Sequence, residues 1–326
     1  MQQLKHYQKL VIDNLKDIFS GYKAEIKELY EPIIYALEGG KKIRPVSVIM
    51  AADVFDGNLQ QAIIPAFAVE MFHNFTLLHD DVMDNSPVRR NRQTVHAKWD
   101  ANQAILSGDA MMILVYQKLL ELPTEKVKPV MELINKTALQ VCEGQQLDMD
   151  FETNLNVPLE KYMQMIKLKT AVLLAASLAL GAIIANADKK DIQEIYNFGI
   201  NIGLAFQIQD DYFDTFGDFE TFGKKIGNDI VTNKKTFLLI SALNLAEGES
   251  KTRLEKLFID KTFDEKSKID NVKEIFYELQ IPEIAQNQIH NYYQKAIKNI
   301  DNIKRASTSK KEILYKFAEH IVKREK

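Results

Sequence analysis

Helical periodicity with few interruptions is the feature that most limits what this sequence can fold into. The 326 residues include only 13 Gly and 8 Pro. Apolar residues recur at spacings of three and four, as Ile64, Phe67, Met71 and Phe75 do. The sequence lacks the alternating runs of β-branched residues that are typical of half-buried strands. It therefore predicts an all-α fold, and because no low-complexity linker divides the chain, we expect one domain over residues 1–326.

Composition excludes several classes of function. The formal net charge is −3 and the pI is about 6.1, so no global attraction to nucleic acid or acidic membranes is expected and any anion site must be local. A single cysteine, Cys142, excludes internal disulfides and thiolate zinc clusters. The N-terminal residues lack the pattern of a secretion signal, which predicts a cytoplasmic protein.

One segment raises the question of a membrane span. Residues 170 to 187 are uncharged and approach the length that crosses a bilayer. They are mostly Ala, with Ser, Gly and Asn interspersed. Small residues suit a helix packed closely against its neighbours, so the segment is interpreted as a buried core helix.

Two acidic clusters share the same spacing. "HDDVMD" contains Asp80, Asp81 and Asp84, and "FQIQDDYFD" contains Asp210, Asp211 and Asp214. On helices, the first and third aspartates of each cluster lie one turn apart. A single cluster could be a solvated helix end, but this spacing should occur by chance roughly 0.1 times in such a chain, so its repetition favours a function.

The chemistry of these carboxylates indicates a divalent metal. Like-charged carboxylates held together would have raised pKa values unless cations intervene. Hard oxygen ligands favour Mg²⁺ over Zn²⁺, and Mg²⁺ usually completes its coordination with water and substrate phosphates. The clusters therefore predict a magnesium site for a phosphorylated ligand.

Basic residues near the acidic clusters are candidate ligands for the phosphates. Arginine side chains have forked donors that match phosphate oxygens, and Arg89 and Arg90 directly follow the break at Asn85-Ser86-Pro87. Each remaining candidate is weak alone, because surface lysines are usually solvated. These candidates are Lys41, Lys42, Arg44, Lys169, Lys224, Lys234 and Lys235.

Together these motifs resemble the trans-isoprenyl diphosphate synthases of the polyprenyl synthetase family. They occur in the family's order: "GGKKIRP", "HNFTLLHDDVMDNSPVRR", "SGDA", "GQQLD", "KT", "FQIQDDYFD" and "GNDIVTNKKT". The sequence departs from the family pattern at Asn91 and Asn233, where Gly is usual or frequent. The departure at Asn91 puts the shape of its loop in question, although it removes no ligand.

The resemblance implies a single large helical bundle with a central cavity, of the isoprenoid synthase type, that acts as a homodimer. It also implies roles for individual residues. Three Mg²⁺ ions, for which Mn²⁺ can substitute, would be held by Asp80, Asp84 and Asp210, with supporting contacts from Asp81, Asp211 and Asp214. Arg89, Lys169, Lys224 and Lys234 would bind the diphosphate of an allylic substrate, and Lys41, Arg44, His73 and Arg90 that of isopentenyl diphosphate. Carbonyl groups near Lys169 and Thr170, with the Gln207 side chain, would stabilise an allylic cation.

The expected activity is condensation of isopentenyl diphosphate with an allylic diphosphate. Within the family, Phe75 and the absence of an insertion in "DDVMD" resemble enzymes that form geranylgeranyl diphosphate, so we expect this product first and farnesyl diphosphate second. Phe75 would limit chain length with Phe72 behind it, while the small Thr76 leaves room; packing is the alternative reading of both phenylalanines. A terpene cyclase and a non-catalytic synthase subunit are alternative functions.

Overall fold

The computed structural model describes residues 2–20, 26–152, 154, 156–217, 226–259 and 264–323, with backbone alone for 16–20 and 323. The contacts divide the chain into two compact units. Unit 1 comprises residues 1–135, 176–196 and 303–313, and unit 2 comprises 136–175, 197–302 and 314–326. The single domain expected over residues 1–326 stays a prediction.

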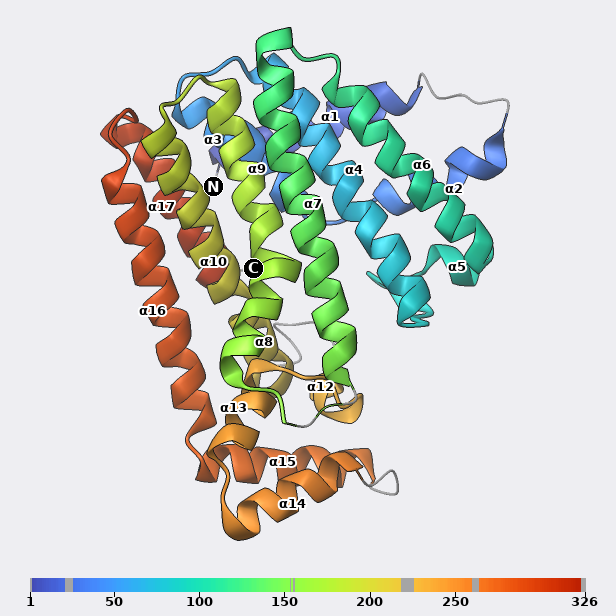
Figure 1. Ribbon diagram of the computed structural model, residues 1–326, viewed down its shortest axis with the longest axis vertical. Helices are drawn as coiled ribbons and strands as arrows, with labels where there is room; N and C mark the ends of the chain where they lie inside the picture. The colour runs from blue at the N-terminus through green and yellow to red at the C-terminus, as the bar shows by residue number, and fades with distance from the viewer. Residues whose placement is uncertain are drawn as a thin grey trace. The chain divides into compact units, whose positions relative to one another are not determined.

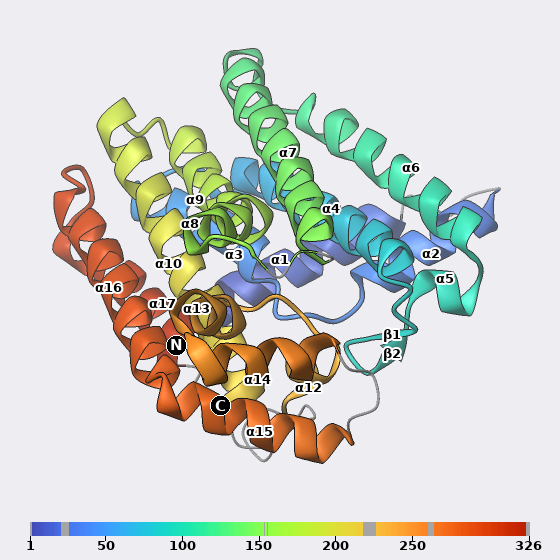
Figure 2. The same ribbon diagram turned by 60° about the horizontal axis from the view of Figure 1, so that its bottom comes forward.

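Unit 1 is built from helices and, within the described residues, one short pair of strands (Figures 1 and 2). Helices α4 and α6 lie side by side, and α3 packs against α4. Its elements are α1 (Gln2–Ser20), α2 (Lys27–Leu37), α3 (Ile43–Val54), α4 (Leu59–Met83), β1 (Val88–Arg89), β2 (Arg92–Gln93), α5 (Val95–Lys98) and α6 (Ala101–Leu119).

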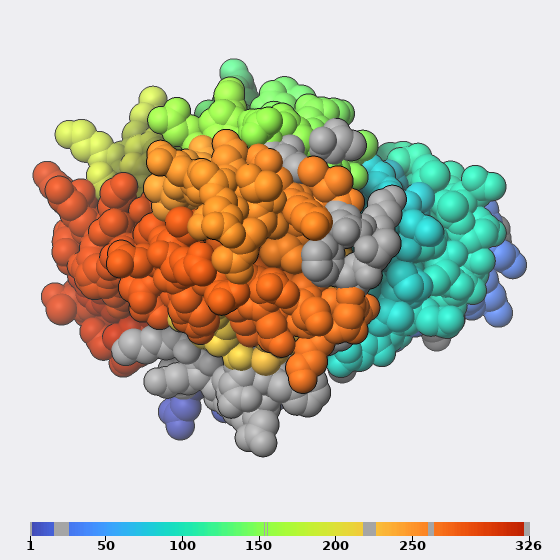
Figure 3. Space-filling view, turned by 90° about the horizontal axis from the view of Figure 1, so that it is seen from below, coloured from blue at the N-terminus to red at the C-terminus, as the bar shows by residue number. Residues whose placement is uncertain are grey.

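Unit 2 contains shorter helices around an apolar core. Helix α13 packs against α8, α14 and α16, and α14 and α15 form much of the surface that Figure 3 shows in orange. Its elements are α8 (Leu159–Ile166), the π-helix η1 (Lys167–Ala171), α12 (Asn228–Val231), α13 (Phe237–Leu245), α14 (Gly248–Ile259), α15 (Glu265–Glu278) and α16 (Ile281–Asn302). Four further helices contribute residues to both units: α7 (Thr124–Glu152), α9 (Val172–Ile184), α10 (Lys189–Phe216) and α17 (Thr308–Lys323).

The all-α prediction is confirmed, and local sequence signals explain several helix ends. Asn58 caps α4 by accepting hydrogen bonds from the backbone N–H groups of Gln60 and Gln61. The helix ends at Met83, followed by Asn85 in the left-handed region at φ 48°. Asn tolerates this conformation better than most residues, so the break predicted at Asn85-Ser86-Pro87 lies where expected.

The uncharged segment forms part of a long helical stretch. Leu159–Ile184 is long and apolar enough to cross a membrane, but 78% of its apolar window is buried inside the protein. Within unit 2, Gly199 and Gly203 of α10 lie directly against Ala175 and Ala171. Small residues on both sides let the backbones approach closely, which is the packing expected of a core helix.

Candidate active site

The first acidic cluster occupies the end of α4. Asp80 and Asp81 belong to its last turn, and Asp84 is its C-cap residue. Asp81 is buried, Asp80 is half-buried and Asp84 is exposed. The helix therefore presents two carboxylates to solvent or ligand and turns the third inward.

A β-hairpin follows this cluster and carries the arginines. Val88 pairs with Gln93 and Arg89 with Arg92, which leaves Arg90 and Asn91 as a two-residue turn. Both turn residues have positive φ, at 54° and 59°. A type I′ turn requires this combination and favours Asn or Gly, so Asn91 is compatible with the tight turn that the family's glycine would make.

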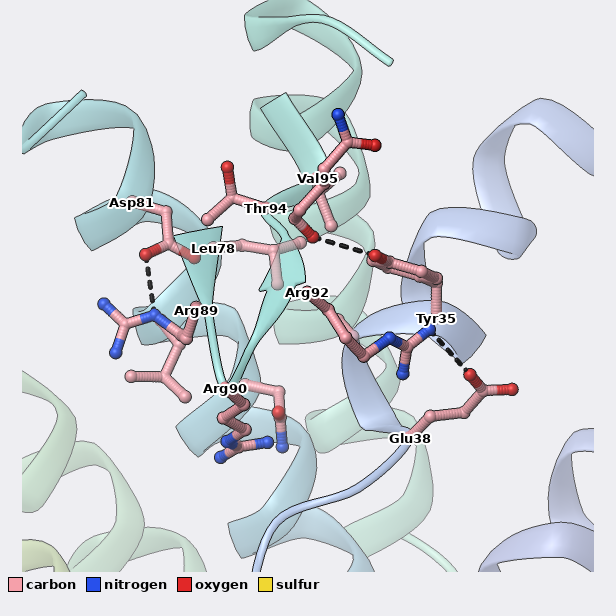
Figure 4. A pocket seen from close by; sticks show the side chains of 13 residues that line it. Tyr35, Glu38, Leu78, Asp81, Arg89, Arg90, Arg92, Thr94 and Val95 are labelled. Carbon is pink, nitrogen blue, oxygen red and sulfur yellow. Dashed lines mark hydrogen bonds and ion pairs between the residues drawn. The ribbon is translucent and has the colours of Figure 1, made fainter. Parts of the chain in front are cut away.

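Neighbouring arginines of the hairpin have different partners. The Nε atom of Arg89 donates to Oδ1 of Asp81 at 2.6 Å, as the dashed line in Figure 4 shows, whereas Arg90 points away from this pair. Burial raises the pKa of the Asp81 carboxyl, and Arg89 opposes that rise. Arg89 thus pairs with the buried carboxylate of Asp81, while Arg90 lines a separate pocket.

The pocket that Arg90 lines, here called the basic pocket, has a volume of about 420 Å³. It brings together all four residues that the resemblance assigns to isopentenyl diphosphate. Its lining consists of Gly40, Lys41, Lys42, Ile43, Arg44, Glu70, His73 and Arg90, all in unit 1. The concentration of cationic groups makes the pocket suited to a polyvalent anion.

His73 is a neutral member of the basic pocket. Burial, together with the charges of Arg44 and Arg90, lowers the pKa of its imidazole well below 6.5. Its Nε2 lies 3.1 Å from Nη1 of Arg44, and because a guanidinium can only donate, Nε2 is the acceptor. Burial lowers the pKa of Arg44 to about 10, which leaves it charged at neutral pH. The buried Nε of Arg44 has no hydrogen-bond partner in the protein.

Lys42, also a candidate ligand from its position in "GGKKIRP", is paired with groups of the protein. It is buried, and its Nζ donates to Oε1 of Glu70 at 2.8 Å and to the Leu37 carbonyl at 2.6 Å. Nδ2 of Asn74 also donates to Oε1 of Glu70, at 2.9 Å. Sequence reasoning missed Glu70, although an acidic residue inside the apolar stretch before His73 was a usable signal.

The second acidic cluster lies at the end of α10 in unit 2 and organises the segment that follows it. Oδ2 of Asp211 accepts hydrogen bonds from the Tyr162 hydroxyl at 2.7 Å and the Phe237 N–H at 2.8 Å. Oδ2 of Asp214 accepts from the Asp229 N–H at 2.9 Å. Both carboxylates are buried, and burial raises the pKa of Asp211 to about 6 despite these donors. Asp210 is the more exposed member.

Lys169, Thr170 and Gln207 lie close together in unit 2. The Thr170 hydroxyl donates to Oε1 of Gln207 at 3.1 Å, and Nε2 of Gln207 donates to Oδ1 of Asp211 at 3.1 Å. This chain of hydrogen bonds fixes which way the Gln207 amide faces. Lys169 and Thr170 belong to η1, and π-helical turns of this kind often occur at functional sites.

Two motif residues had no role assigned from the sequence, and both of them pair with lysines. Oδ2 of Asp148, the last residue of "GQQLD", accepts a hydrogen bond from Lys169 Nζ at 2.5 Å. Oδ1 of Asp229 lies 3.6 Å from Lys234 Nζ. Burial lowers the pKa of Lys234, but Asp229, Asp211, Asp210 and Asp148 outweigh burial and raise it overall.

The loop that carries Lys234 is anchored by a hydrogen bond from α15. Asn233 has φ 60° and accepts a hydrogen bond from the buried Lys268 of α15, so this departure from Gly also occurs at a left-handed position. Lys235 is buried, and burial lowers its pKa. Lys224 lies outside the described residues.

The three residues expected to set chain length lie on α4. Phe72 is buried at 2% exposure, whereas Phe75 and Thr76 are half-buried. The Phe75 ring lies 5.7 Å from that of Phe72 and makes an edge contact with His79 at 4.7 Å. The Thr76 hydroxyl donates to the His73 carbonyl at 2.8 Å.

The carboxylates fit a magnesium ion that is completed by a ligand. Among the described residues, no group of three or more His, Cys, Asp or Glu side chains could hold a metal by itself. Asp80, Asp84 and Asp210 are the cluster members with solvent-facing surface, and carboxylate oxygen is the donor that Mg²⁺ prefers. Protein sites for Mg²⁺ often supply one or two carboxylates and leave other positions to water and phosphate.

Comparisons with known proteins agree with these motifs. Residues 26–277 match the polyprenyl synthetase family. The chain is 32% identical over 335 residues to the geranylgeranyl diphosphate synthase of Sulfolobus acidocaldarius, with complete coverage of both. A crystal structure of geranylgeranyl pyrophosphate synthetase from Pyrococcus horikoshii superimposes with a TM-score of 0.91 at 33% identity, covering 99% of each chain. Another geranylgeranyl pyrophosphate synthase structure gives 0.93 at 41% identity, covering all of both chains. Motifs, fold and relatives agree, and the chain belongs to the polyprenyl synthetase family.

Proposed function

We propose that the protein is a short-chain trans-isoprenyl diphosphate synthase that joins isopentenyl diphosphate to an allylic diphosphate, with geranylgeranyl diphosphate as its main product. The observation that carries this proposal is the basic pocket, which gathers Lys41, Arg44, His73 and Arg90 in the unit that also carries the first acidic cluster. An enzyme that joins two diphosphates needs a second anion site besides the one served by metal. The names of the relatives support the product.

The basic pocket is suited to hold the diphosphate of isopentenyl diphosphate without a metal. Lys41, Arg44 and Arg90 supply positive charge, and neutral His73 orients the Arg44 guanidinium. The buried Nε of Arg44 is an unused donor for a phosphate oxygen. Binding here would fix the alkene carbon that attacks the allylic substrate.

The allylic diphosphate would bind with Mg²⁺, for which Mn²⁺ can substitute, at Asp80, Asp84 and Asp210, while Asp81, Asp211 and Asp214 support the helix ends. The metal supplies positive charge that stabilises the leaving diphosphate. Arg89, Lys169, Lys224 and Lys234 add cationic contacts to the same group. Three ions are expected from the family resemblance.

In the proposed reaction, the carbon–oxygen bond of the allylic substrate breaks and leaves an allylic cation and free diphosphate. Carbonyl dipoles near Lys169 and Thr170, with Oε1 of Gln207, stabilise the cation without attacking it. The alkene of isopentenyl diphosphate then forms the new carbon–carbon bond, and the released diphosphate accepts the proton that is lost. No side-chain nucleophile takes part.

Mass analysis of products tests the proposal. The purified chain is incubated with isopentenyl diphosphate and with dimethylallyl, geranyl or farnesyl diphosphate, and the expected product has twenty carbons. Chelation of divalent metal should abolish turnover. Asp80→Ala and Asp210→Ala should each lower turnover by about 10² or more while circular dichroism stays unchanged.

The same assay separates the alternatives. A terpene cyclase would convert an allylic diphosphate to hydrocarbon without isopentenyl diphosphate, and a non-catalytic subunit would give no turnover alone. The basic pocket and the two complete acidic clusters argue against both. Appreciable condensation without divalent metal would contradict the proposed mechanism.

We also propose that the protein is a cytoplasmic homodimer. The exposed residues Leu106 and Ile113 of α6 and Leu120, its C-cap residue, recur every seven residues, with exposed fractions of 57%, 66% and 67%. A regular apolar stripe of this kind on a helix surface favours burial against another protein surface. A second copy of the chain fits the family resemblance.

A further inference from the structure

The third arginine of "RRNR" has no assigned role in the reaction, although it makes several defined contacts. Nη2 of Arg92 donates to Oε2 of Glu38 at 2.9 Å, and its guanidinium carbon lies 4.0 Å from the centre of the Tyr35 ring. The Tyr35 hydroxyl donates to the carbonyl of Gln93 at 2.8 Å. Figure 4 shows Arg92 lying between Tyr35 and Glu38. We call Tyr35, Glu38 and Arg92 the clasp.

The clasp joins two segments that each contribute to the basic pocket. Glu38 is followed by Gly39, Gly40 and Lys41, and Arg92 is preceded by the turn residues Arg90 and Asn91. The two segments also meet inside the pocket, where a Cβ atom placed on Gly40 would lie 2.9 Å from Cζ of Arg90. Arg90 therefore packs directly against Gly40. The clasp ties the chain two residues before Gly40 to the chain two residues after Arg90.

The ion pair between Arg92 and Glu38 contributes little to the overall stability of the fold. The side chains of Arg92 and Glu38 are 40% and 58% exposed, and exposed ion pairs contribute little to folding. The contacts act locally: Gly39 and Gly40 both have positive φ, at 77° and 74°, and glycine is the most conformationally free residue. Tying Glu38, next to this loop, to Arg92 of the hairpin narrows the positions that Lys41 and Arg90 can occupy relative to each other.

We infer that Arg92 and Glu38 are positioning residues for the basic pocket, which hold Lys41 and Arg90 in the arrangement that binds the diphosphate of isopentenyl diphosphate. Neither residue needs to touch the substrate. The inference rests on the proposed function for the identity of the ligand, but not for the contacts themselves. It concerns binding of one substrate only, because Arg89 and the acidic residue it contacts lie on the other side of the hairpin.

Steady-state kinetics of clasp variants provide the test. Arg92→Ala and Glu38→Ala should each raise KM for isopentenyl diphosphate roughly three- to tenfold, the range that an exposed ion pair with a cation–π contact can supply. KM for the allylic substrate and kcat at saturation should change less than twofold. The double variant should be no worse than the more affected single variant, because both substitutions remove the same contact. Arg92→Lys, which keeps the charge but loses the flat stacking on Tyr35, should recover part of the affinity.

Arg253→Ala is the matched control, since Arg253 forms a similarly exposed pair with Glu274 at 2.8 Å but lies in unit 2. It should leave both KM values unchanged. Three outcomes would overturn the inference: a KM for isopentenyl diphosphate within twofold of wild type in Arg92→Ala, an equal rise in both KM values, or fully additive effects in the double variant.

Calorimetry with inorganic diphosphate in the absence of metal separates this inference from the proposed function. If the wild-type chain shows no turnover, the proposed function fails. The inference about the clasp would still predict that inorganic diphosphate binds more weakly to Arg92→Ala than to wild type. Comparison with Arg44→Ala shows which part of the binding belongs to the basic pocket. Equal binding by wild type and Arg92→Ala, where Arg44→Ala binds more weakly, would refute the clasp.

Discussion

Residues that are adjacent in the sequence have separate tasks around the basic pocket. Lys41 lines the pocket as an exposed side chain, whereas Lys42 is buried against Glu70. Arg89 and Arg90 differ similarly, because one contacts Asp81 and the other contacts Gly40. Charge alone therefore does not identify a ligand; the partner of each charge does.

Gly40→Ala should weaken binding of isopentenyl diphosphate through Arg90. The new methyl group would lie 2.9 Å from Arg90 Cζ, and φ at this position is 74°. We expect KM for isopentenyl diphosphate to rise about tenfold or more, since loss of one charge-assisted contact costs about 1.5–3 kcal/mol. Gly39→Ala is the control, because φ is 77° there but nothing lies within 4 Å of the added Cβ. Equal effects of the two substitutions would attribute the change to backbone strain.

His73, which is half-buried and has a lowered pKa, should make stability depend on pH. Burial and nearby cations lower its folded pKa well below 6.5, so the unfolded state binds more protons between the two pKa values. This contribution to stability is fully present above pH 6.5 and is lost as the pH falls below it. The slope for one proton approaches about 1.4 kcal/mol per pH unit.

Denaturant unfolding of wild type and His73→Gln between pH 5 and pH 8 measures this effect. The wild-type free energy of unfolding should fall more steeply below pH 6.5 than that of the variant. His290→Gln, which changes an exposed histidine, should leave the slope unchanged. Identical slopes for wild type and His73→Gln would show that folding does not lower the pKa of His73.

The sequence predicted the candidate ligands better than it predicted their partners. Lys41, Arg44, His73 and Arg90 carry recognisable motifs, and the structure places them in one pocket. The pairing of Lys42 with Glu70 was not predictable from local pattern, because the two residues are 28 positions apart and meet only after α3 packs on α4. Two adjacent lysines look alike in sequence until the fold supplies a buried acid for one of them.

Helix boundaries depend mostly on local signals, and several were predictable for that reason. The end of α4 at Met83 follows from Asn85-Ser86-Pro87, and its start follows the cap residue Asn58. The π-helix η1 was not predicted. It lies against Gly144 of α7, where an added Cβ would be 2.4 Å from the Lys169 backbone nitrogen. A contact between such distant segments leaves no periodic signal in either one.

Phe75 on α4 should limit product length. Phe75 is half-buried and contacts the rings of Phe72 and His79, so truncation to Ala would remove a large side chain near Thr76. We expect Phe75→Ala to shift products upward by one or more five-carbon units in mass analysis. Phe72→Ala is a poorer test, because Phe72 is only 2% exposed and the substitution should cost about 3–5 kcal/mol.

Phe72→Leu is the control for this experiment, since it keeps most of the buried volume and should leave the product spectrum unchanged. An unchanged spectrum in well-folded Phe75→Ala would place the chain-length limit elsewhere. Met111 and Met112 of α6 would then be the next candidates, because α6 packs along α4.

At the scale of the whole molecule, helical periodicity predicted the fold class, but composition gave no information about assembly. A 46% hydrophobic content is enough for a large core, yet it cannot separate residues buried within one chain from residues buried between chains. The structure identifies apolar residues of α6 that are not buried within the chain. Ile113 is 66% exposed although it lies in a long, regular helix whose opposite side is packed against α4.

Ile113→Asp, combined with Leu106→Asp, should therefore shift the protein from dimer to monomer. A charge placed in an apolar interface loses hydration without gaining a partner, which costs several kcal/mol across two symmetric copies. Size-exclusion chromatography with light scattering measures the mass. Ile259→Asp is the control, because Ile259 is equally exposed at 67% but lies at the end of α14 outside this stripe. A wild-type monomer, or a dimer that persists in the double variant, would show that the α6 stripe does not mediate self-association. Dissociation by Ile259→Asp as well would indicate a general effect of added charge, because isologous interfaces bury one specific patch from each copy.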